Sequence, residues 1–190
     1  MVFPRLTCWL FAFLYLYPVI AQESLNQHLG FSIGYGSQLG QELNYEYRVW
    51  LFQGEYKNTL FDWGSWKIKL MVSPQFNIAQ FKDRKEYFPS KSAFELGINV
   101  ALLVQKKLLD KISLFTGLAS GPHYVSDVPD RQASGFIFSD HVIAGFEIFL
   151  PNRLSLDLTY AFRHMSNLSI KKPNGGINNT VFFLGVSKQI

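Results

Sequence analysis

The chain has 190 residues, of which 48% are hydrophobic and 17% are charged, and its formal net charge is +4. This length fits one ordinary domain and excludes a large multidomain protein. The positive charges are spread over polar segments and form no basic helix or nucleic-acid motif, so a nucleic-acid partner is not expected.

The start of the chain has the order of a secretory signal peptide. Arg5 precedes a short apolar run, and Ala21 ends a stretch of small and medium residues. The run is shorter than the ~20 apolar residues of a membrane-spanning helix. We therefore expect a signal peptide at 1–21 and one β-barrel domain at 22–190. The only cysteine, Cys8, lies in the signal, which excludes disulfides and cysteine chemistry from the mature chain.

After the signal, apolar and polar residues alternate in segment after segment. A period of two residues is the pattern of β-strands. Eight such segments predict an all-β fold with an even number of strands. The segments lie near 31–35, 45–51, 66–72, 94–104, 112–118, 136–150, 154–162 and 180–190.

The connections between these segments are short and long in turn. A tight turn at 151–153 contrasts with longer polar loops at 80–92 and 120–135. Short turns at one rim and long loops at the other are typical of outer-membrane barrels. The last segment also runs to the C-terminus, as the closing strand of such a barrel does.

The two faces of the segments differ in character. We expect the apolar face, rich in aromatic rings, to contact lipid and the polar face to line a narrow lumen. The sequence thus predicts an eight-stranded antiparallel transmembrane β-barrel in the bacterial outer membrane. The alternative that the same alternation allows is a soluble lipid-carrying barrel. The charged residues expected in the lumen are Glu46, Arg48, Lys67, Lys69 and Glu95.

Two polar residues at the end of the seventh segment stand on its apolar face. His164 and Ser166 share the even numbering of the apolar residues in 154–162, so both are expected to face outward at the outer rim. Alternate residues of a strand are ~7 Å apart, which brings an imidazole within reach of a serine hydroxyl. A base beside a serine suits nucleophilic catalysis. The plainer alternative is that both side chains only lie at the membrane interface, where polar groups contact water and lipid headgroups.

The segment around this pair resembles the signature of the lipid A 3-O-deacylase family. His-Met-Ser-Asn at 164–167 is followed by Pro-Asn-Gly-Gly-Ile at 173–177, at that family's spacing. The resemblance covers about 136–184. It implies an eight-stranded outer-membrane barrel that hydrolyses the ester at the 3-position of lipid A.

The resemblance also implies a role for individual residues. Ser166 would be the nucleophile and His164 the general base, whereas Asn167 and Asn174 lie where the family stabilises the oxyanion. The chain departs from the family pattern at one position, because Asn178 stands where the family has a glutamate. Reduced or absent activity is therefore an open outcome.

Pairing of the last segments offers two partners for His164. Counting across the last hairpin sets Asn178 opposite His164, and an amide oxygen can accept from the imidazole N–H. Counting across the turn at 151–153 sets Asp140 opposite His164 on the other side. We expect Asp140, Asn178 or both to orient His164. The alternative for Asp140 is a carboxylate in water above the hydrocarbon.

The implied mechanism needs no cofactor, and His28, His123 and His141 show no metal-ligand spacing. The lumen is expected to contain His141. Lipid A, as part of lipopolysaccharide, is the expected substrate, and a homodimer is among the expected assemblies. The rival interpretation is a non-catalytic barrel, structural or surface-binding, with a degenerate triad. Basic residues that would bind lipid A phosphates are Lys82, Arg84, Lys85, Lys91, Lys171 and Lys172. The alternative for them is that they are only solvated loop charges.

Overall fold

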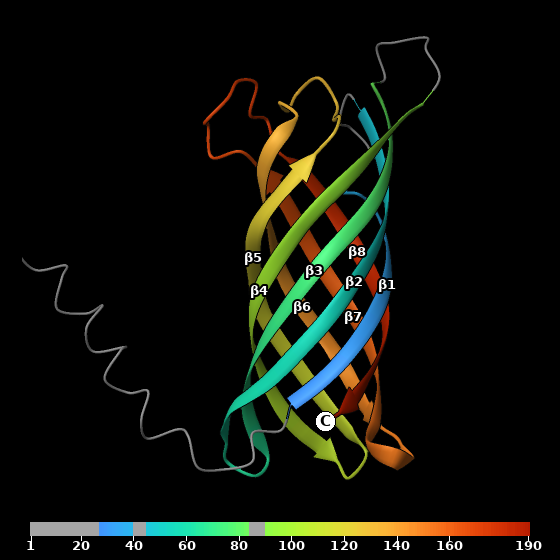
Figure 1. Cartoon of the computed structure of the whole chain (residues 1–190), viewed down its shortest axis with the longest axis vertical. Helices are drawn as coiled ribbons and strands as arrows, with labels where there is room; N and C mark the ends of the chain where they lie inside the picture. Colours follow the sequence, from blue (N-terminus) through green and yellow to red (C-terminus); the bar gives the residue numbers. More distant parts are fainter. Residues whose placement is uncertain (1–26, 40–44, 84–89) are drawn as a thin grey trace, which may run out of the picture.

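A computed structural model of the chain describes residues 27–39, 45–83 and 90–190. Eight antiparallel strands close into a barrel in which each strand pairs with the next and β1 pairs with β8 (Figure 1). The predicted eight-stranded antiparallel β-barrel is confirmed. The strands are β1 (Gln27–Gln38), β2 (Tyr45–Asp62), β3 (Trp66–Asp83), β4 (Lys91–Leu109), β5 (Ile112–Val125), β6 (Gly135–Phe149), β7 (Leu154–Ser166) and β8 (Ile177–Gln189).

Some sequence predictions fall on residues that are not described. The signal peptide expected at 1–21 lies outside the described residues, as do Arg84 and Lys85. Within the ranges that are described, no helix has the length and hydrophobicity to cross a membrane.

The two rims of the barrel differ as the loop lengths predict. The tight turns at 63–65, 110–111 and 150–153 lie at one rim, together with the C-terminus (Figure 1). The opposite rim carries the longer connections, including 126–134 and 167–176. We call the rim with the long connections the loop rim and the rim with the tight turns the turn rim. β7 runs toward it and ends there at Ser166, so the end of β7 lies beside these loops.

Several strands are longer than the alternation predicts. β3 continues to Asp83 and β5 to Val125, so the loops expected at 80–92 and 120–135 begin later than predicted. On β5 the outward-facing Ser120 interrupts the apolar stripe, which resumes nearer the loop rim at the exposed Tyr124. The alternation signal therefore fades before the strand ends.

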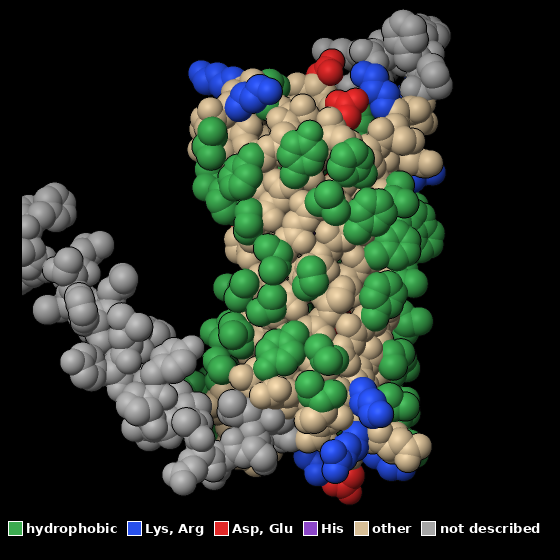
Figure 2. Space-filling view, in the orientation of Figure 1, with side chains coloured by type: hydrophobic (Ala, Val, Ile, Leu, Met, Phe, Trp, Pro, Cys, Tyr) green, Lys and Arg blue, Asp and Glu red, His purple; other side chains and the backbone are tan. Residues whose placement is uncertain are grey.

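The outer wall is apolar between two charged ends. Figure 2 shows hydrophobic side chains over the wall and charged side chains gathered at both rims. Aromatic residues mark both edges of this band, with Trp63 and Trp66 at the turn rim and Tyr124 and Phe136 toward the loop rim, all more than 40% exposed. This is the surface that a membrane-spanning barrel presents to lipid.

The lumen near the loop rim is filled by aromatic rings rather than by charges. Tyr45 and Tyr47 point inward and are 2% and 1% exposed, and the Tyr47 and Phe81 rings stack with centroids 6.4 Å apart. Glu46 and Arg48 therefore point outward and are exposed. The prediction that these two charges line the lumen is wrong, because this part of β2 places its apolar residues inside.

Deeper in the lumen, buried charges are paired, as expected for Lys69 and Glu95. Lys69 Nζ lies 2.8 Å from Glu147 Oε2, and Arg163 Nη2 lies 2.6 Å from Glu95 Oε2. Lys67 also lies on the inward side of β3, half-buried at the turn rim. Pairing offsets the large cost of burying each charge.

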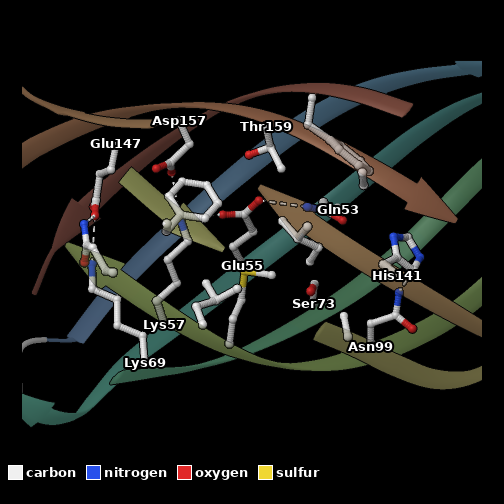
Figure 3. Close-up of a pocket in the computed structure, with 18 of the residues that line it drawn as sticks. Gln53, Glu55, Lys57, Lys69, Ser73, Asn99, His141, Glu147, Asp157 and Thr159 are labelled. Carbon is white, nitrogen blue, oxygen red and sulfur yellow. Dashed lines mark hydrogen bonds and ion pairs between the residues drawn. The ribbon is translucent and has the colours of Figure 1, made fainter. Parts of the chain in front are cut away.

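A small cavity of about 40 Å³ lies among these lumen side chains (Figure 3). Lys57 in its wall is 2.6 Å from Asp157 Oδ2. His141 also lines the cavity, as predicted, and its Nε2 is within hydrogen-bond distance of both Asn99 and Ser139. The polar network thus fills the interior and leaves the outer wall for apolar residues.

Candidate active site

Four polar side chains form a row across the outer wall near the loop rim. Ser120 on β5 is paired with Asp140 on β6, and Asp140 is paired with His164 on β7. His164 is paired in turn with Asn178 on β8. Both pairings predicted for His164 are therefore present. The row is outward-facing, with Ser120 exposed and the other three half-buried.

The inward residues of β7 decide where His164 and Ser166 point. Arg163 and Met165 are 0% exposed, and Arg163 is held inside by its ion pair with Glu95. Because side chains alternate along a strand, His164 and Ser166 lie on the outer face. Both are half-buried.

Within the row, the side chains are joined in two pairs. His164 Nδ1 lies 2.6 Å from Asn178 Oδ1, and Ser120 Oγ donates to Asp140 Oδ1 at 2.6 Å. An amide oxygen only accepts, so Nδ1 carries a proton, and in the neutral imidazole Nε2 then has the lone pair. Among the described residues, no hydrogen bond joins Ser166 to His164. Catalytic hydrogen bonds of this kind often form only with substrate bound.

The two expected oxyanion residues organise the loop at 167–176. The Asn167 backbone N–H donates to Asn174 Oδ1 at 2.9 Å, and Asn167 Nδ2 donates to the Lys171 carbonyl at 2.7 Å. Asn174 Nδ2 donates to Ser169 Oγ at 3.3 Å. Asn167 follows Ser166 directly and is only 1% exposed, whereas Asn174 is half-buried.

A second loop, at 126–134, is tied to this one. The Gly175 N–H donates to the Arg131 carbonyl at 2.7 Å, and the Ala133 N–H donates to the Pro173 carbonyl at 2.8 Å. Gln132, only 3% exposed, accepts from the Gly176 N–H at 3.0 Å. The sequence alone does not predict these residues, because no periodicity or motif marks contacts between two loops.

Gly176 lies directly against His164. Its φ is +67°, a region that disfavours side chains, and a Cβ there would be 2.7 Å from His164 Cε1. The loop backbone therefore packs on the edge of the imidazole. Gln132 and Gly176 together connect the 126–134 loop to His164.

An open groove of about 470 Å³ lies on the outer wall beside His164. It crosses from β7 over β6, β5 and β4 to β3, and Asp140 and Ser120 line it near the loop rim. An apolar groove suits a hydrocarbon chain. Its outward apolar residues are Leu70, Val100, Leu102, Leu118, Val142 and Phe162.

The loop beside the site is both apolar and basic. Leu168 and Ile170 are 63% and 71% exposed, and Lys171 and Lys172 follow them on the surface. Across the described part of the chain, no group of three or more His, Asp or Glu side chains is placed to hold a metal ion.

A closed eight-stranded barrel with an apolar outer wall defines an outer-membrane β-barrel protein. A family model described as lipid A 3-O-deacylase (PagL) matches residues 29–187. The chain therefore belongs to the lipid A 3-O-deacylase family, and its place is the bacterial outer membrane.

Solved structures share this fold. The crystal structure of the outer membrane enzyme PagL is 16% identical, with a TM-score of 0.58, covering 83% of this chain and 97% of that one. The crystal structure of Neisserial surface protein A is 10% identical, with a TM-score of 0.60, covering 88% of this chain and 100% of that one. At such identities the likeness is one of fold alone. Among curated protein sequences, none matches this chain.

Proposed function

We propose that this protein hydrolyses an ester-linked acyl chain at the 3-position of lipid A, with Ser166 as nucleophile and His164 as general base. Membership of the deacylase family supports the reaction class. The observation that carries the assignment is the His164–Asn178 hydrogen bond of 2.6 Å on the outer face of the barrel, with Ser166 on the same face of the same strand. A lipid in the outer leaflet reaches this face without leaving the membrane.

The proposed reaction proceeds in two steps. Ser166 Oγ attacks the ester carbonyl while its proton passes to His164 Nε2, and the protonated imidazole then gives that proton to the departing sugar oxygen. The acyl chain is left as an ester on Ser166. In the second step water attacks this ester, again through His164, and the fatty acid is released. His164 accepts and donates the proton in both steps.

The developing oxyanion needs donors beside Ser166. Each side-chain amide of Asn167 and Asn174 donates one hydrogen bond within the loop, and an NH₂ group has a second N–H. We assign these second N–H groups to the oxyanion. Donors fixed in advance by the loop suit this role, because they need no reorganisation during the reaction.

His164 needs an acceptor to hold its tautomer, and Asn178 is assigned that role because its Oδ1 lies 2.6 Å from His164 Nδ1. It brings no negative charge to steady the imidazolium that forms, so a rate below that of a carboxylate triad is expected. The prediction that Asp140 also orients His164 stays a prediction. Its carboxylate is opposite His164 in register, but its hydrogen bond goes to Ser120.

The loop beside the site matches the chemistry of a lipid A headgroup. Lys171 and Lys172 are assigned to its phosphates, and the exposed Leu168 and Ile170 to the acyl region just below. Lys82 and Lys91, at the loop rim on β3 and β4, belong to the same set of basic residues. The comparisons do not support the homodimer expected from the sequence, and the reaction proposed here needs one chain.

A second candidate is a non-catalytic barrel. It is favoured by Asn178, which replaces the charged member of the family's triad, and by the lack of a described hydrogen bond between Ser166 and His164. Such a protein would keep the fold and the surface loops and bind lipid without cleaving it.

Mass spectrometry of lipid A separates the two candidates. Lipid A in detergent is incubated with the folded barrel and with Ser166→Ala, His164→Ala and, as a matched control, Ser92→Ala, which removes an exposed hydroxyl on β4. We expect wild type and Ser92→Ala to remove one acyl mass and the other two variants to remove none. If lipid A stays intact in every sample, the protein is the non-catalytic barrel and not the deacylase.

A further inference from the structure

A second cavity, of about 250 Å³, lies inside the barrel at the turn rim, at the end opposite to His164. It is separate from the groove on the outer wall, because it is lined by inward side chains of several strands and by the turn at 150–153. One water needs only ~10–15 Å³ of such space, so a small ion with several heavy atoms fits here.

Three cationic side chains line this cavity, those of Lys67, Lys69 and Arg153. Lys69 is 4% exposed, and its ammonium donates to Glu147 Oε2 at 2.8 Å (Figure 3). An ammonium has three N–H donors, so two of them have no acceptor among the described residues. Lys67 is paired with Asp62, whereas the side chain of Arg153 has no ion pair or hydrogen bond within the described ranges. The cavity therefore offers cationic donors to an anion.

Neutral polar side chains in the same wall are buried without partners. His28 is 8% exposed and Thr59 is 6% exposed, yet no described residue bonds His28 Nδ1 or Thr59 Oγ1. A buried polar group without a partner costs about 1–3 kcal/mol, so two of them in one cavity point to a bound polar ligand. The charges that act on His28 come from three lysines and one carboxylate, which makes its surroundings net positive.

The strand register brings these groups together. Thr59 on β2 is directly opposite Lys69 on β3, and Lys67 is directly opposite Gln105 on β4. His28 on β1 is opposite a residue two positions before Thr59, so it is a diagonal neighbour of Thr59. Side chains directly opposite have Cβ atoms ~4.5–5.5 Å apart, and diagonal residues are ~7–8 Å apart. One small anion can therefore contact several of these side chains at once.

Gln105 limits which anion fits. Its Nε2 donates to Glu147, because a carboxylate only accepts, and its Oε1 is buried without a partner among the described residues. Glu147 also accepts from Lys69 and Ser155, so its charge is compensated within the wall. The ligand then needs anionic oxygens for the cations and one O–H for Gln105 Oε1. Inorganic phosphate has both near neutral pH, whereas sulfate has the oxygens but no O–H.

We propose that this cavity at the turn rim is a phosphate-binding site, which takes either the free ion or the phosphate group of a small hydroxylated molecule. The cations of Lys67, Lys69 and Arg153 bind its oxygens, and its O–H donates to Gln105 Oε1. The site lies at the other end of the barrel from Ser166, so it does not depend on the proposed hydrolysis.

Isothermal titration calorimetry of the folded protein in a phosphate-free detergent, such as octyl glucoside, measures binding of inorganic phosphate directly. We expect Arg153→Gln to weaken binding about tenfold or more, because it removes a charged donor. Thr59→Val nearly keeps the shape of the side chain, and loss of its hydroxyl should weaken binding about two- to tenfold. Lys188→Gln is the matched control and should bind like wild type, because Lys188 is an exposed cation near the same rim that does not line the cavity.

Two further anions identify the ligand. Sulfate should bind wild type about tenfold or more weakly than phosphate, and Gln105→Met should bring the two affinities close together, because it removes the acceptor of the O–H. Glycerol 1-phosphate is a phosphate group on a small hydroxylated molecule. If it binds more tightly than inorganic phosphate, the ligand is an organic phosphate, and the reverse order assigns the site to the free ion.

Three results would overturn the phosphate site. The first is wild type that binds neither inorganic phosphate nor glycerol 1-phosphate at about 10 mM. The second is an equal loss for Lys188→Gln and Arg153→Gln, which would show that diffuse surface charge attracts the anion. The third is equal affinity of wild type for phosphate and sulfate. Heat-modifiable gel mobility checks that each variant is folded, and Arg153→Gln and Thr59→Val test the site independently of each other.

Discussion

The imidazole of His164 on β7 is hydrogen-bonded through Nδ1 to the amide oxygen of Asn178 on β8, at 2.6 Å. The two residues are direct cross-strand partners, so the backbone register itself holds the contact. An amide at this position fixes the tautomer of the imidazole but adds no charge. Replacing the amide nitrogen of Asn178 by a carboxylate oxygen should therefore make His164 a stronger general base.

Asn178→Asp keeps the length of the side chain and replaces the amide by a carboxylate. We expect it to raise kcat about tenfold or more, because loss of the carboxylate from such a site can cost ~10⁴ in rate. Asn178→Ala should lower kcat about tenfold, since the imidazole loses its orienting partner. Initial rates of acyl release from lipid A measure both effects. Equal rates for wild type and both variants would show that Asn178 has no part in the reaction.

Gly176 predicts a second effect on the same imidazole. Gly176→Ala would place a Cβ 2.7 Å from His164 Cε1, so the ring or the loop must move. We expect kcat to fall about 100-fold, the usual cost of misplacing a catalytic group by ~1 Å. Gly64→Ala is the matched control, because Gly64 also has a positive φ, +76°, but a Cβ there meets nothing within 4 Å.

Both glycine variants carry the same backbone strain of about 1 kcal/mol. Gly176→Ala adds the cost of moving the ring or the loop, so its unfolding midpoint in urea, followed by gel mobility, should shift at least as far as that of Gly64→Ala, and only Gly176→Ala should lose activity. A Gly176→Ala protein with wild-type kcat would mean that the loop does not hold the imidazole.

Much of the site could be predicted from sequence because β-strands are periodic. The turn at 151–153 joins β6 to β7 with little freedom, so the partner of His164 on β6 follows by counting, and Asp140 is found there. Alternation likewise predicts the outward direction of His164 and Ser166. These features depend on local geometry alone.

Other features depend on contacts that no local pattern encodes. The partner of Asp140 is Ser120, across a long loop whose length does not fix the register of β5 with β6. The hydrogen bond from Gly176 to Gln132 requires two loops to meet above the rim. In β2 the predicted alternation is correct but its direction is wrong, because aromatic residues such as Tyr47 fill the lumen and form the same sequence pattern as a lipid-facing stripe.

The buried pair Arg163–Glu95 should contribute strongly to stability. Glu95→Ala leaves Arg163, fully buried and next to His164, without its carboxylate, and we expect a loss of about 3–5 kcal/mol in the free energy of unfolding. Asp62→Ala breaks the Lys67–Asp62 pair, whose side chains are 28% and 40% exposed, and should cost less than about 1 kcal/mol. Urea midpoints of heat-modifiable gel mobility compare the two. Similar losses would contradict the burial argument.

Gln132 connects the neighbouring loop to the site through one side-chain oxygen. Gln132→Ala removes the acceptor of the Gly176 N–H and should loosen the loop at 167–176, so we expect kcat to fall about tenfold. Gln132→Glu keeps an acceptor oxygen and should remain close to wild type. The rate of limited trypsin digestion at the exposed Lys171 measures how well the loop at 167–176 is ordered. Faster cleavage is expected for Gln132→Ala only. Faster cleavage with unchanged kcat would show that loop order and the position of His164 are independent.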